Sequence, residues 1–472
     1  MPNSNTKHFK ALIREKLSDK KLRNIVKKAT SHSISKRIET INNYIPEWEQ
    51  LRDRANFIRS KTMQNWEFYF EQLLKKFREN GIEFFYANNS SDACSIVKTL
   101  LFSFGVKKVV KSKSMVTEEI GLNEYLERNG FEVTETDLGE YIIQLANEKP
   151  SHITAPALHK SRQEIGELFS EKFNIDYTDA PEKLTEFARL ILRQKFLNAD
   201  AGISGANFLV AETGTIIIVE NEGNARLSIT LPKLHIVITS IEKIVPTLSD
   251  ALMLLKLLPV SSTGQKITSY VSFIKKPLQS IGSENSQKIV VIILDNGRSK
   301  LLKNDKSRSI LYCIKCGACM NNCPIYQSVG GHAYGSVYPG PIGSILTPWI
   351  NTLNESKDLA YGSTLCGACS QVCPVKIDIH NQLLGIRKLS IENKYSPLIE
   401  RVIFKLWLLS MKNFKLFTLL SKFLNFLSPL FQESGLKIPF WSKYKYFPAP
   451  AEISFHSWWQ KEVKIKERIN NV

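Results

Sequence analysis

The 472-residue chain is too long for one small hydrophobic core, and its length predicts two or three folding units. A composition of 43% hydrophobic and 23% charged residues excludes fibrous and low-complexity classes. The net charge of +18 is spread along the chain and comes mainly from Lys, which favours a lysine-rich surface or an acidic partner over nucleic acid.

Targeting signals are not evident in the sequence. The first residues, MPNSNTKHFKALIREKL, have no apolar segment of the secretory type, and no uncharged apolar stretch of about 18 residues predicts a membrane-spanning helix. Seven of the eight cysteines fall in two short runs, a spacing typical of metal sites rather than disulfides. We therefore expect a cytoplasmic protein.

The first half of the chain changes pattern near Gly81. Residues 1–80 show apolar positions at helical spacing, so we expect a helical N-terminal region. Beyond it, short β-branched runs alternate with amphipathic helical segments, which predicts an open α/β domain with a largely parallel sheet over residues 81–300. The expected strands are IEFFYA, KKVVKS, FEVTETD, SHITAPAL, TIIIVEN, HIVITS and KIVVIILDN.

Residues 305–395 are loop-rich and contain the two cysteine runs. The first run, Cys313-x2-Cys316-x2-Cys319-x3-Cys323-Pro324, has ferredoxin-type spacing. Its two-residue gaps bring three thiolates to one iron–sulfur cubane, and the fourth thiolate, followed by Pro, points elsewhere. A zinc site needs neither the third close cysteine nor the Cys-Pro pair.

The second run repeats this spacing as Cys366-x2-Cys369-x3-Cys373-Pro374, but Ser363 stands where a first cysteine is expected. If the runs exchange their last thiolates, two clusters result. Cluster 1 takes Cys313, Cys316, Cys319 and Cys373, and cluster 2 takes Cys323, Cys366 and Cys369.

Cluster 2 then has one corner without a cysteine, and three alternatives remain open. A [4Fe–4S] cluster takes the Ser363 oxygen, solvent or an outside ligand there; a [3Fe–4S] cluster lacks that iron; or the cluster is absent. His380 and Asp378 are nearby ligand candidates, although each is better interpreted as a surface group. Cys94, inside an apolar helical run, is interpreted as a core residue.

The last region, residues 396–472, opens with a basic and apolar helical segment, 401–432. It contains no Asp or Glu, and its lysines Lys405, Lys412, Lys415 and Lys422 are expected on one helical stripe. The apolar face either covers the cluster domain of the same chain, docks on a partner, or lies on a membrane surface.

Polar residues gather at the ends of the expected strands, where ligand loops of open α/β sheets lie. Six of them are expected to face a crevice: Lys111, Lys113, Glu212, Arg226, His235 and Arg298. No Walker loop or G-x-G-x-x-G fingerprint is present, so neither a nicotinamide nor a flavin is expected. An electron carrier without a two-electron cofactor indicates a subunit of a larger assembly.

The sequence closely resembles the lactate utilization protein B family over nearly its whole length. The resemblance is carried by KSKSMVTEE, ETDLGEYIIQL, SHITAPALHK, NFLVAETGT, NEGNARL, LPKLHI, LDNGR, CIKCGACMNNCP, GGHAYGSVYPGPIGSILTP and LCGACSQVCPVKI. It implies an α/β domain of the NagB/RpiA/CoA-transferase-like fold and a ferredoxin-like module with seven cluster cysteines. Lys275-Lys276-Pro277 departs from the Gly-Pro-Arg expected there, which leaves an anion-binding role of that loop open.

The resemblance also implies a function. The protein would be the iron–sulfur electron carrier of a cytoplasmic system that oxidises L-lactate to pyruvate, working with A-type and C-type lactate utilization subunits. The electron acceptor is not identified by the sequence. An alternative is that the chain itself binds lactate in the α/β crevice, with His235 or His159 as the catalytic base.

Overall fold

The computed structural model describes residues 7–278, 287–432, 451 and 453–470. The chain divides into two compact units, Met1–Glu392 and Asn393–Val472. Unit 1 holds the N-terminal helices, the α/β region and both cysteine runs.

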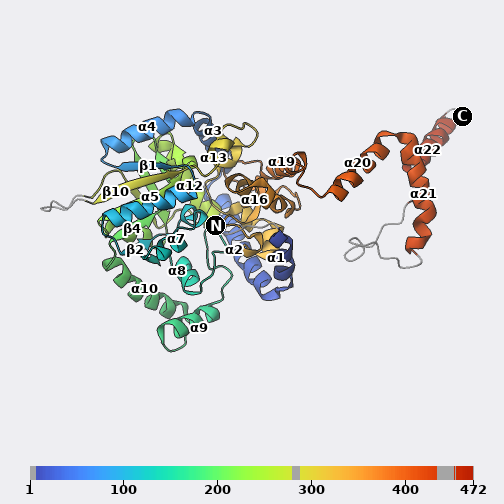
Figure 1. The fold of residues 1–472 in the computed structure, drawn as a ribbon. Helices are drawn as coiled ribbons and strands as arrows, with labels where there is room; N and C mark the ends of the chain where they lie inside the picture. Colours follow the sequence, from blue (N-terminus) through green and yellow to red (C-terminus); the bar gives the residue numbers. More distant parts are fainter. Residues whose placement is uncertain (1–6, 279–286, 433–450, 452, 471–472) are drawn as a thin grey trace. The chain divides into compact units, whose positions relative to one another are not determined.

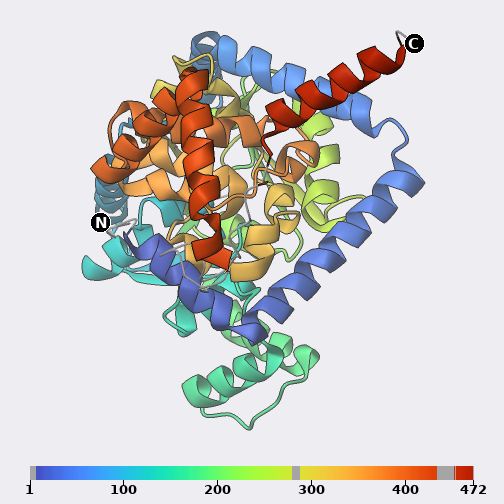
Figure 2. The same cartoon turned by 90° about the vertical axis from the view of Figure 1, so that its right-hand side faces the viewer.

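Four helices open unit 1: α1 (Lys7–Ser18), α2 (Lys20–Tyr44), α3 (Trp48–Gln64) and α4 (Trp66–Glu79). The Asp19 side chain accepts a hydrogen bond from the Leu22 amide and so fixes the start of α2. The long helix α2 runs along the outside of unit 1 between α1 and α3 (Figure 2). The expected helical N-terminal region is therefore present.

A six-stranded parallel sheet forms the centre of the α/β region, in the order β1-β10-β7-β4-β2-β3. The expected α/β class and parallel sheet are confirmed. The central strands are buried on both faces, as covered parallel sheets require. Their bounds are β1 (Glu83–Ala87), β2 (Lys108–Lys111), β3 (Glu132–Glu135), β4 (Ala201–Ser204), β7 (Leu234–Ser240) and β10 (Lys288–Leu294).

Alternate residues of the central strands enter two different cores. Ile236 and Ile292 pack with α5 (Ser90–Ser103), whereas Val237 and Val291 pack with α4 on the opposite face. Figure 1 shows α4 and α5 on these two sides of the sheet. Successive side chains of a strand point to opposite faces of the sheet, so neighbouring residues enter different cores.

A second, four-stranded sheet has the order β8-β5-β6-β9 and was not expected. TIIIVEN forms β6 of this sheet, not a strand of the parallel sheet. The antiparallel pairings β5·β6 and β6·β9 need no helical crossover, so strand–helix alternation did not reveal them. The strands are β5 (Phe208–Val210), β6 (Thr215–Glu220), β8 (Ile244–Val245) and β9 (Tyr270–Ile274).

SHITAPAL, expected as a strand, is a loop of turns and bends. The imidazole Nδ1 of His152 accepts hydrogen bonds from the amides of Thr154 and Ala155, which curls the chain back on itself. The remaining helices of the α/β region are α6 (Met115–Glu119), α7 (Leu122–Arg128), α8 (Leu138–Leu145), α9 (Arg162–Phe173), α10 (Pro181–Leu197), α11 (Asn224–Thr230), α12 (Leu248–Thr263) and α13 (Arg298–Leu302).

The cysteine region is built from short helices and loops, as expected. Its aliphatic side chains share one core with the N-terminal helices and with α12, so the three segments fold together. The helices are α14 (Ala318–Asn321), α15 (Pro324–Val329), α16 (Gly340–Ile350), α17 (Leu353–Ser356), α18 (Ala368–Gln371) and α19 (Ile379–Glu392).

Unit 2 contains α20 (Leu398–Lys412), α21 (Phe414–Gln432) and α22 (Phe455–Asn470). The expected single basic helix is interrupted at Asn413, so Lys405 and Lys412 lie on α20 while Lys415 and Lys422 lie on α21. Among the described residues, no helix combines the length and hydropathy needed to cross a bilayer. Residues 433–450 of the expected C-terminal region lie outside the described residues.

Candidate iron–sulfur site

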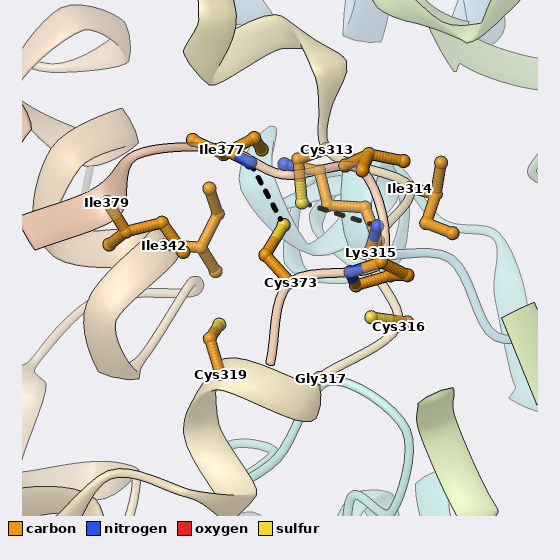
Figure 3. A pocket seen from close by; sticks show the side chains of 12 residues that line it. Cys313, Ile314, Lys315, Cys316, Gly317, Cys319, Ile342, Cys373, Ile377 and Ile379 are labelled. Carbon is orange, nitrogen blue, oxygen red and sulfur yellow. Dashed lines mark hydrogen bonds between the residues drawn. The ribbon is translucent and has the colours of Figure 1, made fainter. Parts of the chain in front are cut away.

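Cys313, Cys316, Cys319 and Cys373 line one pocket (Figure 3). The first three come from the loop before α14 and from α14 itself, and the fourth follows α18. Their side chains point toward one another across the pocket. The second run therefore contributes its last cysteine to the pocket of the first run, which is the arrangement expected from exchanged thiolates.

The backbone around this pocket turns tightly. Lys315 and Gly317 both have positive φ, 60° and 78°, which bends the chain between successive cysteines. The turn aims amide groups at sulfur, with the Lys315 amide 3.3 Å from the Cys313 Sγ. The Ile377 amide lies 3.4 Å from the Cys373 Sγ. Such N–H groups stabilise anionic thiolates.

The residues present fit a cubane. The sulfurs surround the pocket, and among the described residues no three His, Cys, Asp or Glu side chains are close enough to hold a single metal ion. A cubane needs this spread, because each thiolate binds a different iron. Burial raises the pKa of Cys316 to about 12 and that of Cys373 to about 11, so metal binding must displace thiol protons. The pocket wall is otherwise mainly aliphatic, with Ile314, Ile342 and Ile377 among its residues.

The other three cysteines form a second group. Cys323 lies close enough to Cys366 and Cys369 for the charges of the thiolates to interact. Burial raises the pKa of Cys369 to about 11, and the neighbouring Cys323 adds to this increase. Cys323 and Cys369 are buried, whereas Cys366 is exposed. Burial also raises the pKa of Tyr334, whose hydroxyl faces the Cys323 thiol. This group has one exposed side.

The three side chains considered for the open corner, Ser363, His380 and Asp378, have partners of their own. The Ser363 Oγ accepts a hydrogen bond of 3.1 Å from the Leu365 amide. The His380 Nδ1 lies 2.8 Å from the Ser370 Oγ and 3.0 Å from Asp378. Each side chain is thus held in a local turn. Cys94 is buried, and burial raises its pKa to about 11, which agrees with the core interpretation.

Lys111 and Arg298, expected in the crevice, are buried in ion pairs. The Lys111 Nζ lies 2.6 Å from Glu135 and 3.3 Å from Glu118, and these carboxylates outweigh burial and raise the pKa of Lys111. Arg298 pairs with Glu119 at 2.6 Å and with Glu242 at 2.9 Å. Both cations are 0% exposed, so they hold the strand ends together instead of facing solvent.

Lys113 differs from these two cations. Its Nζ is buried without a hydrogen bond and lies 3.9 Å from Glu140 Oε1, which also lacks a hydrogen-bond partner. Burial lowers the pKa of Lys113 and raises that of Glu140 to about 8. Of the six expected crevice residues, Lys113 has the least satisfied side chain.

The remaining crevice candidates are dispersed. Glu212 is exposed and accepts a hydrogen bond from the Leu248 amide at the start of α12. Arg226 lies over the Tyr270 ring at 4.7 Å. Lys275-Lys276-Pro277 follows the end of β9. The structure thus does not gather all six residues into one crevice.

The two candidates for a catalytic base, His235 and His159, lie in different parts of the α/β region: one in strand β7 and one in the loop before α9. His235 is 1% exposed within β7, its Nε2 is 2.7 Å from the Ser204 Oγ, and burial lowers its pKa to about 3. Its ring is therefore a neutral core group. The His159 Nε2 lies 2.7 Å from Glu148 and its Nδ1 lies 2.8 Å from the Ser151 Oγ, so both ring nitrogens have partners.

Sequence reasoning missed His152. Its Nε2 lies 3.2 Å from the Asn321 Oδ1, and its ring packs against Gly317 in the loop between Cys316 and Cys319. Burial lowers the pKa of His152 to about 4, which keeps it neutral. The quoted motif SHITAPALHK contained this histidine, but no spacing rule connects it with residues about 170 positions away. The α/β region thus contacts the first cysteine pocket directly.

Comparison with known proteins supports the two-part architecture. Residues 70–294 match the family model described as the LUD domain, and residues 309–377 match the 4Fe-4S dicluster domain. The chain is 43% identical over 433 residues to lactate utilization protein B of Oceanobacillus iheyensis, covering 90% of each chain. It is 40% identical to the Macrococcus caseolyticus protein of that name, covering 97% of each, and 39% identical to the Bacillus velezensis one, covering 98% of each.

The fold, the cysteine-lined pocket and the family models together define a protein in which a LUD domain is joined to a 4Fe-4S dicluster domain. The relatives extend this likeness over nearly the full chain at about 40% identity. The chain belongs to the lactate utilization protein B family. The name of the family and the 4Fe-4S dicluster domain support a role in lactate utilization and iron–sulfur electron transfer.

Proposed function

We propose that this chain is the electron carrier of an L-lactate oxidation system and passes electrons singly from the lactate site to an acceptor. One observation carries the proposal: Cys373 shares a pocket with Cys313, Cys316 and Cys319, so the two runs depend on each other. Two bound cubanes would supply one-electron steps at adjacent positions. Oxidation of lactate to pyruvate releases two electrons and two protons, which matches two such carriers.

The burial of the cysteines supports a direction for this path. The first pocket lies beside the α/β region through His152 and is lined by buried cysteines, apart from half-buried Cys313. The second group reaches the surface at Cys366. The first site therefore suits transfer within the chain, and the second suits exchange with a partner. Cys323, Cys366 and Cys369 would hold a [4Fe–4S] cluster with an outside fourth ligand, or a [3Fe–4S] cluster.

The proposed partners are the A-type and C-type lactate utilization subunits, and lactate is oxidised wholly or partly on them, in the cytoplasm. The test is anaerobic purification with these partners, followed by iron counting and EPR before and after L-lactate is added. We expect L-lactate to reduce the clusters only when the partners are present. If the complete mixture leaves fully loaded clusters oxidised, the proposal fails.

A second candidate function places lactate in this chain. It is favoured by Lys113, whose buried Nζ has no hydrogen-bond partner and lies near Glu140 at the carboxyl ends of the strands. An ammonium group suits a carboxylate, and the neighbouring Glu140 can accept the hydroxyl proton once it is ionised. Lactate-dependent dye reduction by the isolated chain would support this candidate. Lys113→Met should then abolish the dye reduction. His159→Gln tests the catalytic base that was expected from the sequence.

Unit 2 is proposed to contact the membrane surface through residues 401–432. Large apolar side chains on α20 and α21, including Phe404, Trp407, Phe417 and Phe423, are exposed. Lysines accompany them, as in helices that bind anionic interfaces. Sedimentation with phosphatidylglycerol vesicles, but not phosphatidylcholine vesicles, is the expected result. Equal recovery with both lipids, or with neither, would reject the contact.

A further inference from the structure

The N-terminal helices contact the segments that carry the first cysteine pocket, although residues 1–69 lie outside both matching family models. Three arginines make these contacts: Arg37 on α2, and Arg52 and Arg59 on α3. We call these three residues the arginine collar.

Two members of the collar hold the second cysteine run. The Arg52 Nε donates to the Cys373 carbonyl at 3.0 Å, and its Nη2 donates to the Gln371 carbonyl at 2.6 Å. The Arg37 Nη2 donates to the Val372 carbonyl at 3.1 Å. Three consecutive carbonyls are therefore bound by guanidinium groups. Since these bonds end at Cys373 itself, they fix where its thiol enters the pocket.

The third member holds the first cysteine run. Arg59 is 1% exposed and donates to the carbonyls of Leu311 at 2.8 Å and Tyr312 at 3.2 Å, immediately before Cys313. It also donates to the Ile244 carbonyl at 2.8 Å and to the Glu242 carbonyl. Because Arg52 and Arg59 are two turns apart on α3, one helix face connects both cysteine segments.

The collar brings positive charge to the first pocket, mainly through Arg37 and Arg59, because the Arg52 Nη1 is paired with Glu49 at 2.6 Å. All the hydrogen bonds of Arg59 end on carbonyls, and the carboxylate of nearby Glu242 is paired with Arg298. Lys243, 8% exposed, adds another cation close to Cys313. Burial lowers the pKa of Arg59 to about 10 and that of Lys243 to about 8, which is the cost of an insufficiently paired buried charge. An anion in the pocket would offset this cost.

The second cysteine group has different surroundings. One guanidinium reaches the loop before Cys366: the Arg387 Nη2 donates to the Ser363 carbonyl at 3.3 Å, and Arg387 is only half-buried. Cys366 is also exposed to water, which screens nearby cations but solvates the charge gained on reduction, so only the buried site depends on cations to offset its burial. A four-thiolate cubane is an anion that gains further negative charge on reduction, so nearby cations favour its reduced form.

We propose that the arginine collar clamps Cys373 to the first pocket and makes the cluster held there the higher-potential centre of the two. The inference rests on the cluster assignment in the proposed function. It gives the N-terminal helices a role in electron transfer, because they set the difference in electron affinity between adjacent centres. Electrons that enter the chain then rest at the buried site until a partner engages the exposed one.

The test is an anaerobic redox titration of the full chain, with both EPR signals followed in each variant. Arg37→Gln removes one collar charge, and Lys243→Met removes a nearby charge without touching the clamp. Arg54→Gln is the matched control, because Arg54 is an exposed residue on α3. We expect each of the first two variants to weaken the electron affinity of the higher-potential centre about tenfold, or about 59 mV for one electron. The other centre and the control should not shift.

Arg52 separates clamping from charge. Arg52→Gln should lower both the midpoint potential and the iron retained in the first site, whereas Arg52→Lys should keep the potential but lose iron. Unchanged midpoint potentials in fully loaded Arg37→Gln and Lys243→Met would overturn the inference, as would a shift confined to the lower-potential centre. Failure of the proposed function is distinguishable, since it appears in the wild-type chain as missing signals or as no reduction by lactate with partners.

Discussion

The Tyr338 hydroxyl donates a hydrogen bond of 2.7 Å to the Glu119 carboxylate and so links the cysteine region to the α/β region. Glu119 also binds Arg298 at the carboxyl end of β10. Burial opposes ionisation of Glu119, but Arg298 prevails and keeps its pKa below the ordinary range. The charged carboxylate therefore anchors Tyr338, which is 0% exposed.

Replacing this tyrosine tests how tightly the two regions are coupled. Tyr338→Phe removes one hydrogen bond to a buried charged group and should lower the free energy of unfolding by about 1–3 kcal/mol. Urea denaturation followed by circular dichroism measures the change. Tyr177→Phe is the control, because Tyr177 is 55% exposed and should shift stability by less than about 0.5 kcal/mol. Equal stability of both variants would show that the hydrogen bond contributes nothing.

Single cysteine substitutions should separate the two sites. Cys373→Ser removes a ligand of the first site although it lies in the second run, so the iron content should fall by about four per chain. Cys366→Ser should remove the signal of the second site instead. Cys94→Ala should retain all the iron, because Cys94 is a core residue. Loss of the same signal in the Cys373 and Cys366 variants would contradict the exchange of thiolates.

Ser363 allows a further test of the second site. Its Oγ already accepts the Leu365 amide, so Ser363→Ala should leave the EPR spectrum of that cluster unchanged. Ser363→Cys places a thiolate at the open corner and should change the spectrum, from [3Fe–4S] to [4Fe–4S] if that iron is missing. A changed spectrum in the alanine variant would identify Ser363 as a ligand. No change in the cysteine variant would mean that position 363 does not face the cluster.

The spacing of the cysteines predicts that the two runs exchange their last thiolates, because cluster ligation constrains spacing within a few residues, and Cys373 does lie in the pocket of the first run. The parallel strands were recognisable where β-branched residues form continuous runs, as in β7 and β10. β4 was missed because it reads Ala-Gly-Ile-Ser. Gly202 is required there, since a Cβ atom would lie 1.8 Å from the Ser228 carbonyl oxygen.

Contacts between distant segments could not be predicted from local patterns. The crevice hypothesis grouped Lys111, Lys113 and Arg298 by their position near the ends of strands. It did not anticipate that Lys111 and Arg298 form buried ion pairs with Glu135 and Glu119, which makes both residues structural. His235 was selected by residue type, although a histidine inside a fully buried strand has no access to solvent. The arginine collar depends on contacts between residues more than 180 positions apart, so only the folded chain reveals it.

Glu140 should make the stability of the chain depend on pH. Burial raises its pKa from 4.5 to about 8, although Lys113 and Lys111 oppose the shift; Glu135 and Glu118 add to it. Between about pH 4.5 and 8 the folded chain thus retains a proton that the unfolded chain releases. Stability from this group is complete below pH 4.5 and is lost as the pH rises toward 8.

Glu140→Gln should remove this dependence, because glutamine keeps the shape of the side chain but does not titrate. The slope of unfolding free energy against pH between 5 and 8 should become less negative than in the wild type by up to about 1.4 kcal/mol per pH unit. Glu132→Gln is the control: it lies on β3 with its side chain 46% exposed and pairs with Lys195. An unchanged slope in Glu140→Gln would show that Glu140 titrates alike in the folded and unfolded chains.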